Sequence, residues 1–261
     1  MKEVREVNLM LIEQIQQVMR DCGQLMLQAD RSHAGIETKG TSNNLVTKYD
    51  KAVQHMLQEK LLEWIPEAHF VGEEENVHES IANGKAFIVD PIDGTANFVK
   101  DYKNSAISVA VTQDGEVELG FVYNPYLDEM FTAQRGNGAY CNGKPIHVSN
   151  QPLEAGLSLF GSSSYYPELA DESFRLLRKA FDHSMDIRRS GSAALDLCTI
   201  AAGRAELYFE LRLQPWDYAA GSLIVREAGG TVSRVEGGEI DLTRACSVLA
   251  IGSNVDASFL R

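Results

Sequence analysis

Apolar residues near the N-terminus recur every three or four positions, with charged and amide residues between them. This spacing predicts an amphipathic helix over residues 3–28. A second helix of the same kind is predicted over residues 51–64. The segment between them, residues 30–44, contains several glycine, serine and asparagine residues, and we interpret it as a mobile loop or flexible hairpin that could close over a site.

Short runs of β-branched and aromatic residues predict the strands. Residues 105–112 and 116–123 flank Asp114-Gly115, which is a hairpin signal, and residues 129–133 extend the resulting antiparallel sheet. From residue 157 onward, strands alternate with helices as in an α/β unit. The other predicted strands are 45–47, 68–71, 86–89, 157–160, 185–189, 205–210, 231–235 and 247–251, and the later helices are 168–182, 192–202 and 215–228.

Carboxylates follow the ends of two neighbouring predicted strands. Strand 86–89 is expected to end at Asp90-Pro91, because proline cannot donate to a strand ladder, and Asp93 follows across a turn. Glu73 opens an acidic run directly after the preceding predicted strand. Carboxylates gathered at one point repel one another, so a cationic group is expected to hold them together.

The spacing around these aspartates excludes two kinds of site. A calcium loop of the EF-hand type, counted from Asp90, would need oxygen ligands at Ile92 and Gly94, where the side chains offer none. A phosphatase of the haloacid dehalogenase pattern D-x-D-G-T would place its nucleophile at residue 91, which is proline. A plain Asp-Pro turn, in which Asp93 caps a helix, remains open.

Several other candidate residues also have purely structural explanations. Asp50 and Asp217 each lie at the start of a predicted helix, where a carboxylate caps free N–H groups or interacts with the helix dipole. Gly191-Ser192-Ala193 also begins a helix and fits either a plain cap or an anion contact. Residues 138–144 nearly match a phosphate loop, but proline follows the lysine and no amphipathic helix comes after it, so turns are predicted over 136–145.

Composition and net charge restrict the classes of partner that this protein is expected to bind. The 261 residues are 44% hydrophobic and 23% charged, which is ordinary for a globular protein, and they suffice for one large domain or two closely joined halves. A net charge of −13 argues against nucleic acid or an anionic membrane as a main partner. An acidic protein can still bind phosphate if metal ions reverse the local charge. The cysteines show no C-x-x-C spacing and no apolar run approaches the ~18 residues of a membrane span, so we expect a cytoplasmic protein with free thiols and no zinc site.

Four separate segments combine into a recognisable pattern. They are Leu45-Val46-Thr47 with Asp50, Gly72-Glu73-Glu74, Asp90-Pro91-Ile92-Asp93-Gly94-Thr95-Ala96-Asn97-Phe98, and Trp216-Asp217-Tyr218-Ala219-Ala220-Gly221. In this order they resemble the inositol monophosphatase family, within the lithium-sensitive, magnesium-dependent phosphatases that include fructose-1,6-bisphosphatases. The resemblance implies a layered α/β sandwich of alternating helix pairs and mixed sheets, with residues 1–261 as a single domain that usually forms a homodimer. Residues 1–150 would be an antiparallel-sheet half with most metal ligands, and residues 151–261 an α/β half that supplies Asp217 and substrate contacts.

The resemblance also implies a role for each matching residue. Oxygen ligands of the first magnesium ion would be Glu73, Asp90 and the main-chain carbonyl of Ile92, and those of the second Asp90, Asp93 and Asp217. The catalytic residues would be Thr95 and Asp50, which orient and deprotonate the attacking water, and Glu73, which also serves a third ion. Substrate contacts would come from Asp93, Gly94, Thr95, Gly191, Ser192, Ala193, Glu210 and Asp217.

These roles predict a magnesium-dependent phosphomonoesterase that uses an activated water without a covalent intermediate. The expected substrate is a small phosphorylated polyol, most simply inositol monophosphate, because Glu210 suits a polyol hydroxyl. Fructose 1,6-bisphosphate, 3′-phosphoadenosine 5′-phosphate and NADP are the alternatives within the superfamily. Lithium is the expected inhibitor. A catalytically silent module that binds a phosphorylated ligand is the alternative of another class, and silent members are expected to have lost a ligand or the Thr95 and Asp50 pair, whereas both are present here.

Overall fold

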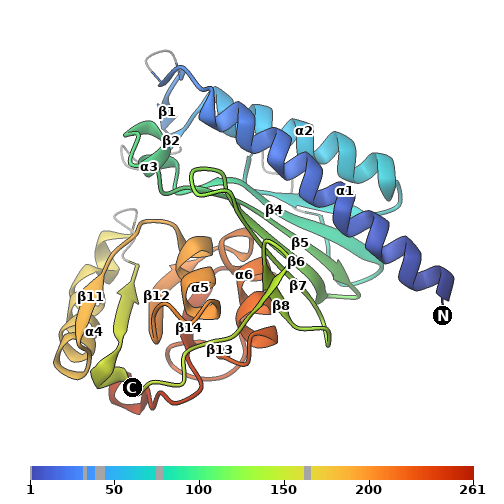
Figure 1. The fold of residues 1–261 in the computed structure, drawn as a ribbon. Helices are drawn as coiled ribbons and strands as arrows, with labels where there is room; N and C mark the ends of the chain where they lie inside the picture. Colours follow the sequence, from blue (N-terminus) through green and yellow to red (C-terminus); the bar gives the residue numbers. More distant parts are fainter. Residues whose placement is uncertain (1, 32–33, 39–44, 75–78, 162–165) are drawn as a thin grey trace.

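Helices and sheets alternate in layers through the molecule (Figure 1). The computed structural model describes residues 2–31, 34–38, 45–74, 79–161 and 166–261. Helices α1 (Lys2–Leu27) and α2 (Lys48–Trp64) cover one face of a seven-stranded sheet, and α5 (Ala193–Ala201) and α6 (Pro215–Glu227) lie against its other face. A five-stranded sheet and then α4 (Ala170–His183) follow, so the layered α/β fold expected from the sequence is confirmed.

The seven-stranded sheet has the order β3-β4-β5-β6-β7-β8-β9. Strands β3 and β4 are parallel, and every later neighbour pair is antiparallel. Its strands are β3 (His69–Gly72), β4 (Lys85–Asp93), β5 (Ala106–Gln113), β6 (Glu116–Asn124), β7 (Glu129–Gln134), β8 (Ala139–Cys141) and β9 (Lys144–Ile146). Because β3 and β4 run in the same direction, the carboxyl ends of both strands meet at one edge of this sheet.

The five-stranded sheet has the order β11-β10-β12-β14-β13 and is mixed. Strand β10 is parallel to both of its neighbours, and β14 is antiparallel to both of its own. Its strands are β10 (Leu157–Phe160), β11 (Asp186–Arg188), β12 (Leu207–Leu213), β13 (Thr231–Ser233) and β14 (Cys246–Ile251). The remaining elements are the two-stranded pair β1 (Glu37–Thr38) and β2 (Leu45–Val46), the short helix α3 (Thr95–Val99), and 3-10 turns at Leu153–Ala155, Pro167–Leu169 and Ser258–Leu260.

Alternating side chains show how the layers are held together. Along β4, Ala86 and Ile88 join the core shared with α5 and α6, whereas Phe87 and Val89 join the core beneath α1 and α2. Successive residues of a strand point to opposite faces, so a strand covered on both faces is apolar throughout. The continuous apolar run of β4 is therefore explained by its place in the middle of the molecule.

The structure corrects the expectation that Pro91 ends its strand. Strand β4 continues to Asp93, and its register against β5 shifts between Asp90, opposite Ser108, and Asp93, opposite Ala106. Three steps on one strand thus span two on the other, which is a β-bulge. A bulge leaves one residue outside the ladder, so a proline without an N–H group is tolerated there.

Several element boundaries also differ from prediction. Helix α2 begins at Lys48, three residues before the predicted start, because Thr47 caps it. Strand β12 continues to Leu213, beyond the predicted end at Glu210, with a register shift between the two residues. The predicted turns at 136–145 include the short hairpin β8–β9.

Of the predicted loop 30–44, residues 32–33 and 39–44 lie outside the described residues. Among the helices in the described part of the chain, none has both the length and the apolar character needed to cross a membrane.

Candidate active site

Three aspartates from two distant parts of the sequence converge at the end of the central sheet. Asp90 and Asp93 come from the bulged end of β4, and Asp217 comes from the first turn of α6. One carboxylate oxygen from each lies within 4.8 Å of the others. Asp90 and Asp93 are buried, and Asp217 is half-buried. The main-chain N–H of Gln214 donates to the Asp217 carboxylate at 2.7 Å, which fixes that side chain at the start of its helix.

Glu73 lies beside this cluster but is not one of the three residues whose oxygens converge. Its main-chain N–H donates to the Val89 carbonyl at 3.2 Å, which ties it to the strand that carries Asp90. Gln54 on α2 holds the same segment, since its side chain donates to the Glu74 carbonyl at 2.8 Å and accepts from the Glu74 N–H at 2.9 Å. The two neighbouring strand ends therefore bring their carboxylates together, as the sequence predicts.

Burial and mutual repulsion dominate the electrostatics of the cluster. Burial, followed by the charge of Glu73, holds the pKa values of Asp90 and Asp217 well above the usual range of a carboxyl group. Burial also raises the pKa of Asp93 to about 6, although hydrogen bonds from Ser192 and Ala194 act against that rise. Carboxylates in this arrangement favour a bound cation, because ionising all of them without one is costly.

Asp50 combines a helix-capping role with a contact to Thr95. It occupies the third position of a capping box at the start of α2, where its carboxylate accepts from the Thr47 N–H at 2.8 Å. Its other oxygen lies 3.1 Å from the Thr95 hydroxyl, so Asp50 contacts the candidate catalytic threonine directly. Burial raises the pKa of Asp50 to about 6, and the hydrogen bond from Thr47 opposes this shift.

The backbone of the bulge is organised by short-range hydrogen bonds. The Ile92 N–H donates to the Asp90 carboxylate at 3.0 Å. The Ile92 carbonyl lies 3.1 Å from the Thr95 hydroxyl, so this hydroxyl is placed between a carbonyl oxygen and the Asp50 carboxylate. These hydrogen bonds hold the Asp90 carboxylate, the Ile92 main chain and the Thr95 hydroxyl close together.

Gly94 is the N-cap residue of α3, and its backbone conformation requires glycine. Its φ of +85° lies in the left-handed region. A Cβ atom there would lie 3.0 Å from the Gly191 carbonyl oxygen and 3.1 Å from the Asn104 carbonyl oxygen. The tight approach brings the start of α3 against the loop before α5, and Asn97 holds the two together by donating to the Ser190 carbonyl at 2.9 Å.

The start of α5 is occupied by Asp93, which the sequence did not predict. Ser192 is the N-cap of α5, and its hydroxyl donates to the Asp93 carboxylate. The Ala194 N–H donates to the same oxygen at 2.9 Å, across 101 residues of sequence. Asp93 therefore satisfies a helix start, as one structural alternative supposed, but the helix is α5 and not the one that follows it in sequence. Gly191, Ser192 and Ala193 lie beside this contact.

Glu210 and Asp196 add two carboxyl groups near the start of α5. Tyr208 donates to the Glu210 carboxylate at 2.9 Å. Burial raises the pKa of Glu210 to about 7, with the Tyr208 hydrogen bond opposing and the charge of Asp93 reinforcing the shift. Asp196 is buried, and burial holds its pKa well above the usual range. Sequence reasoning missed Asp196, although it is the one charged residue in the apolar sequence of α5.

Comparison with known proteins agrees with this arrangement. The model of the inositol monophosphatase family matches residues 8–258. A relative from Vibrio cholerae serotype O1 named Nus factor SuhB is 42% identical over 204 residues, covering 77% of this chain and 76% of the relative. Inositol monophosphatase 2 of Solanum lycopersicum is 38% identical over 232 residues, covering 86% of this chain and 87% of the relative.

Solved structures show the same fold over nearly the whole chain. The extragenic suppressor protein suhB from Bartonella henselae has a TM-score of 0.88 and 33% identity, and the match covers 94% of each chain. A structure described as inositol monophosphate bound SaIMPase-II has a TM-score of 0.83 and 28% identity, covering 97% of this chain and 94% of that one. Layer order and strand arrangement are thus shared with proteins of known structure.

Proposed function

The chain belongs to the inositol monophosphatase family, and on this premise we propose that it is a magnesium-dependent phosphomonoesterase. The observation that carries the proposal is the convergence of Asp90, Asp93 and Asp217 beside a hydrogen-bonded Thr95 and Asp50 pair. Asp50, Asp93 and Asp217 each also cap or fix a helix start. A group of carboxylates withdrawn from water beside a hydrogen-bonded hydroxyl is nevertheless energetically costly, and such a cost is typical of functional sites.

The residues present suit magnesium. Carboxylate and carbonyl oxygens are the ligands that this ion prefers, and the raised pKa values of Asp90 and Asp217 reflect buried negative charge that a divalent cation would offset. We assign the ligands to Glu73, Asp90, the Ile92 carbonyl, Asp93 and Asp217. When bound at such a site, two or three divalent ions supply Lewis-acid stabilisation to phosphate oxygens and lower the pKa of water.

The chain's own groups orient the reactants and move the proton. We propose that the Thr95 hydroxyl binds the attacking water and that Asp50 accepts the proton through it. With its pKa raised to about 6, Asp50 is largely ionised at pH 7 and is close enough in basicity to take up a proton during the reaction. Glu73 faces the same region, so its charge acts on Asp50 as well as on the aspartate cluster.

Phosphate and alcohol are assigned to different parts of the site. The main-chain N–H groups of Gly94 and Thr95 are proposed to bind the phosphate. Gly191, Ala193 and Glu210 are proposed to contact the alcohol, and the half-protonated state of Glu210 near neutral pH allows it to accept from or donate to a polyol hydroxyl. The Ser192 hydroxyl is already directed at Asp93, so its proposed role is to position that carboxylate.

Inositol monophosphate is the substrate we propose first. The Solanum relative is named for that activity, and SaIMPase-II has been solved with inositol monophosphate and with 2′AMP. The site offers a carboxyl group, Glu210, to a polyol hydroxyl, which supports the same choice. Fructose 1,6-bisphosphate, 3′-phosphoadenosine 5′-phosphate and NADP remain the alternatives.

The test is phosphate release from these four compounds in magnesium, in EDTA, and in magnesium with millimolar lithium. Release that needs magnesium and falls with lithium would support the proposal, and preference for one compound would identify the substrate class. Equal rates in sodium and lithium would contradict the proposed inhibition. An absence of release from all four, with magnesium binding demonstrated by calorimetry, would favour the silent ligand-binding module.

We also propose a cytoplasmic homodimer. Phe174, Phe181 and Met185 on or next to α4 are all more than half exposed, which suits a surface that another subunit covers. The four cysteines are free thiols, as expected in a reducing compartment. Sedimentation equilibrium would measure the mass of the assembly, and a monomer at micromolar concentration would contradict the dimer.

A further inference from the structure

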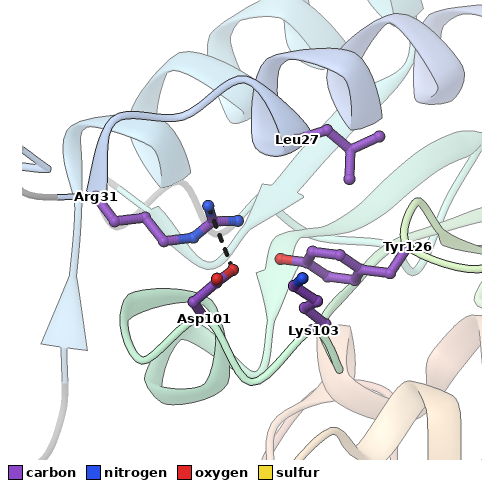
Figure 2. Close-up of a pocket in the computed structure, with 5 residues that line it drawn as sticks. All are labelled: Leu27, Arg31, Asp101, Lys103 and Tyr126. Atoms are coloured by element: carbon purple, nitrogen blue, oxygen red, sulfur yellow. Dashed lines mark ion pairs between the residues drawn. The ribbon is translucent and has the colours of Figure 1, made fainter.

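A separate cavity lies between the end of α1, the segment after α3 and the turn between β6 and β7 (Figure 2). Its volume is about 320 Å³, near the lower end of cavities that bind small molecules. It is lined by Leu27, Arg31, Asp101, Lys103 and Tyr126. None of these residues belongs to the carboxylate cluster, so the cavity needs an explanation of its own.

Arg31 is held at one side of the cavity by contacts with Phe98. Its Nε donates to the Phe98 carbonyl at 3.0 Å, and its guanidinium lies over the Phe98 ring, 5.1 Å from the ring centre. An outer nitrogen of the guanidinium lies 3.4 Å from the Asp101 carboxylate, a longer separation than an ordinary charge-assisted hydrogen bond. The other outer nitrogen donates to the Met26 carbonyl at 3.5 Å. The nitrogen beside Asp101 carries two N–H groups, so it can donate to a ligand while it stays paired with Asp101.

Two further groups around the cavity lack partners. Lys103 makes no hydrogen bond or ion pair with any residue in the described ranges. The hydroxyl of Tyr126 is buried and likewise finds no hydrogen-bond partner in the described part of the chain. In Figure 2 this hydroxyl is directed toward the space beside the Arg31 and Asp101 pair. A buried hydroxyl without a partner is unfavourable, so a ligand that accepts its hydrogen bond would be stabilised.

The loop that carries Lys103 also has an unusual backbone. Asp101 has a φ of +53° and Lys103 a φ of +59°, both in the left-handed region. Aspartate tolerates this region better than most residues, but a lysine there is uncommon and strained. Strained backbone is often retained where it places a functional side chain.

We propose that this cavity binds a small oxyanion of the phosphate or carboxylate class between Arg31, Lys103 and Tyr126, without a metal ion. Two cationic side chains and one carboxylate line it, so its lining is net positive in a protein whose net charge is −13. The proposal does not depend on catalysis. The aspartate cluster repels anions when it lacks metal, so anion binding by the metal-free protein would not come from that cluster.

The experiment is a titration of inorganic phosphate into the full chain, which is first stripped of metal with EDTA and then dialysed free of the chelator. Binding is measured by calorimetry and by the shift in thermal unfolding. Sodium chloride holds the ionic strength constant across the titration. We expect saturable binding and a rise in melting temperature that chloride does not reproduce. An absence of saturable binding of phosphate, sulfate and acetate alike by the unsubstituted protein would overturn the proposal.

Three variants locate the binding. Lys103→Gln should weaken it roughly tenfold through loss of one charge, and Tyr126→Phe about threefold or more through loss of the hydroxyl donor. Lys100→Gln is the matched control, because Lys100 is an exposed lysine nearby that does not line the cavity, and its phosphate affinity should be unchanged. If Lys103→Gln and Tyr126→Phe bind phosphate as tightly as the control, the anion lies elsewhere and the proposal is wrong. Sulfate and acetate, titrated in the same way, divide phosphate-like from carboxylate ligands, and saturable binding of either upholds the site.

Discussion

Substitution of Gly94 by alanine tests how closely the site is packed around the start of α3. Two costs are expected. The φ of +85° is unfavourable for alanine by about 1–2 kcal/mol. The new Cβ would also lie 3.0 Å from the Gly191 carbonyl oxygen and 3.1 Å from that of Asn104, and overpacking of this kind costs about 1–3 kcal/mol. We therefore expect Gly94→Ala to lower the free energy of unfolding by about 2–5 kcal/mol.

Gly84 provides a matched control in the same chain. Its φ is +72°, but a Cβ placed there meets no atom within 4 Å. Gly84→Ala should therefore lose only the backbone cost of about 1–2 kcal/mol. The difference between the two variants, measured by urea unfolding in EDTA, isolates the contribution of close packing against the loop before α5.

Activity should separate the two variants further. The Gly94 clash displaces Thr95, which is the next residue, and a shift of about 1 Å in a catalytic group costs on the order of 100-fold in rate. We expect kcat/KM for phosphate release to fall at least tenfold in Gly94→Ala and to stay unchanged in Gly84→Ala. Equal unfolding free energies and equal rates in the two variants would refute the close approach described here.

Three further predictions concern the carboxyl groups. Asp217→Asn should reduce phosphate release by about 100-fold or more. In EDTA the variant should be no less stable than the unsubstituted protein, because a carboxylate repelled by Glu73 and Asp93 is removed. Activity assays and thermal unfolding check the two parts, and a normal rate would contradict the assigned ligand. The pKa values of Asp50, Asp93 and Glu210 are raised to about 6, 6 and 7, so the metal-free folded state binds more protons than the unfolded state between about pH 4 and 7. Its unfolding free energy should therefore fall by roughly 2–5 kcal/mol from pH 5 to pH 8, less so in magnesium, and a rise over that range in EDTA would contradict the burial of these groups. Glu210→Gln keeps a hydrogen-bond acceptor for Tyr208 but removes the carboxylate charge. The ratio of kcat/KM for inositol monophosphate to that for 3′-phosphoadenosine 5′-phosphate should therefore change about tenfold. An unchanged ratio would show that Glu210 does not contact the substrate.

Much of the fold follows from local patterns in the sequence. The helical spacing of α1 and the hairpin at Asp114-Gly115 are local signals, and the structure confirms both. The proximity of Glu73 and Asp90 could also be predicted from the sequence, because each lies at the end of one of two neighbouring predicted strands. That residues 1–261 act as one domain stays a prediction.

The features that the sequence did not predict depend on contacts between distant residues. Nothing local to Asp93 indicates that it accepts hydrogen bonds from the start of α5, since its partner Ala194 lies 101 residues away. The bulge at Pro91 was missed for a related reason, because a proline ends a regular strand but fits an irregular one that its neighbour supports. Asp196 has no local signal of its own, because one acidic residue within a predicted helix is an ordinary feature of helices.

The contact between Asp93 and α5 also constrains how the protein can fold. One end of this contact belongs to the seven-stranded sheet and the other to the helices that separate the two sheets. Contacts between distant segments form late, after the loops between them have closed. During refolding, recovery of helical and strand signals should therefore precede recovery of activity. The time course of activity would then report when the seven-stranded sheet packs against α5.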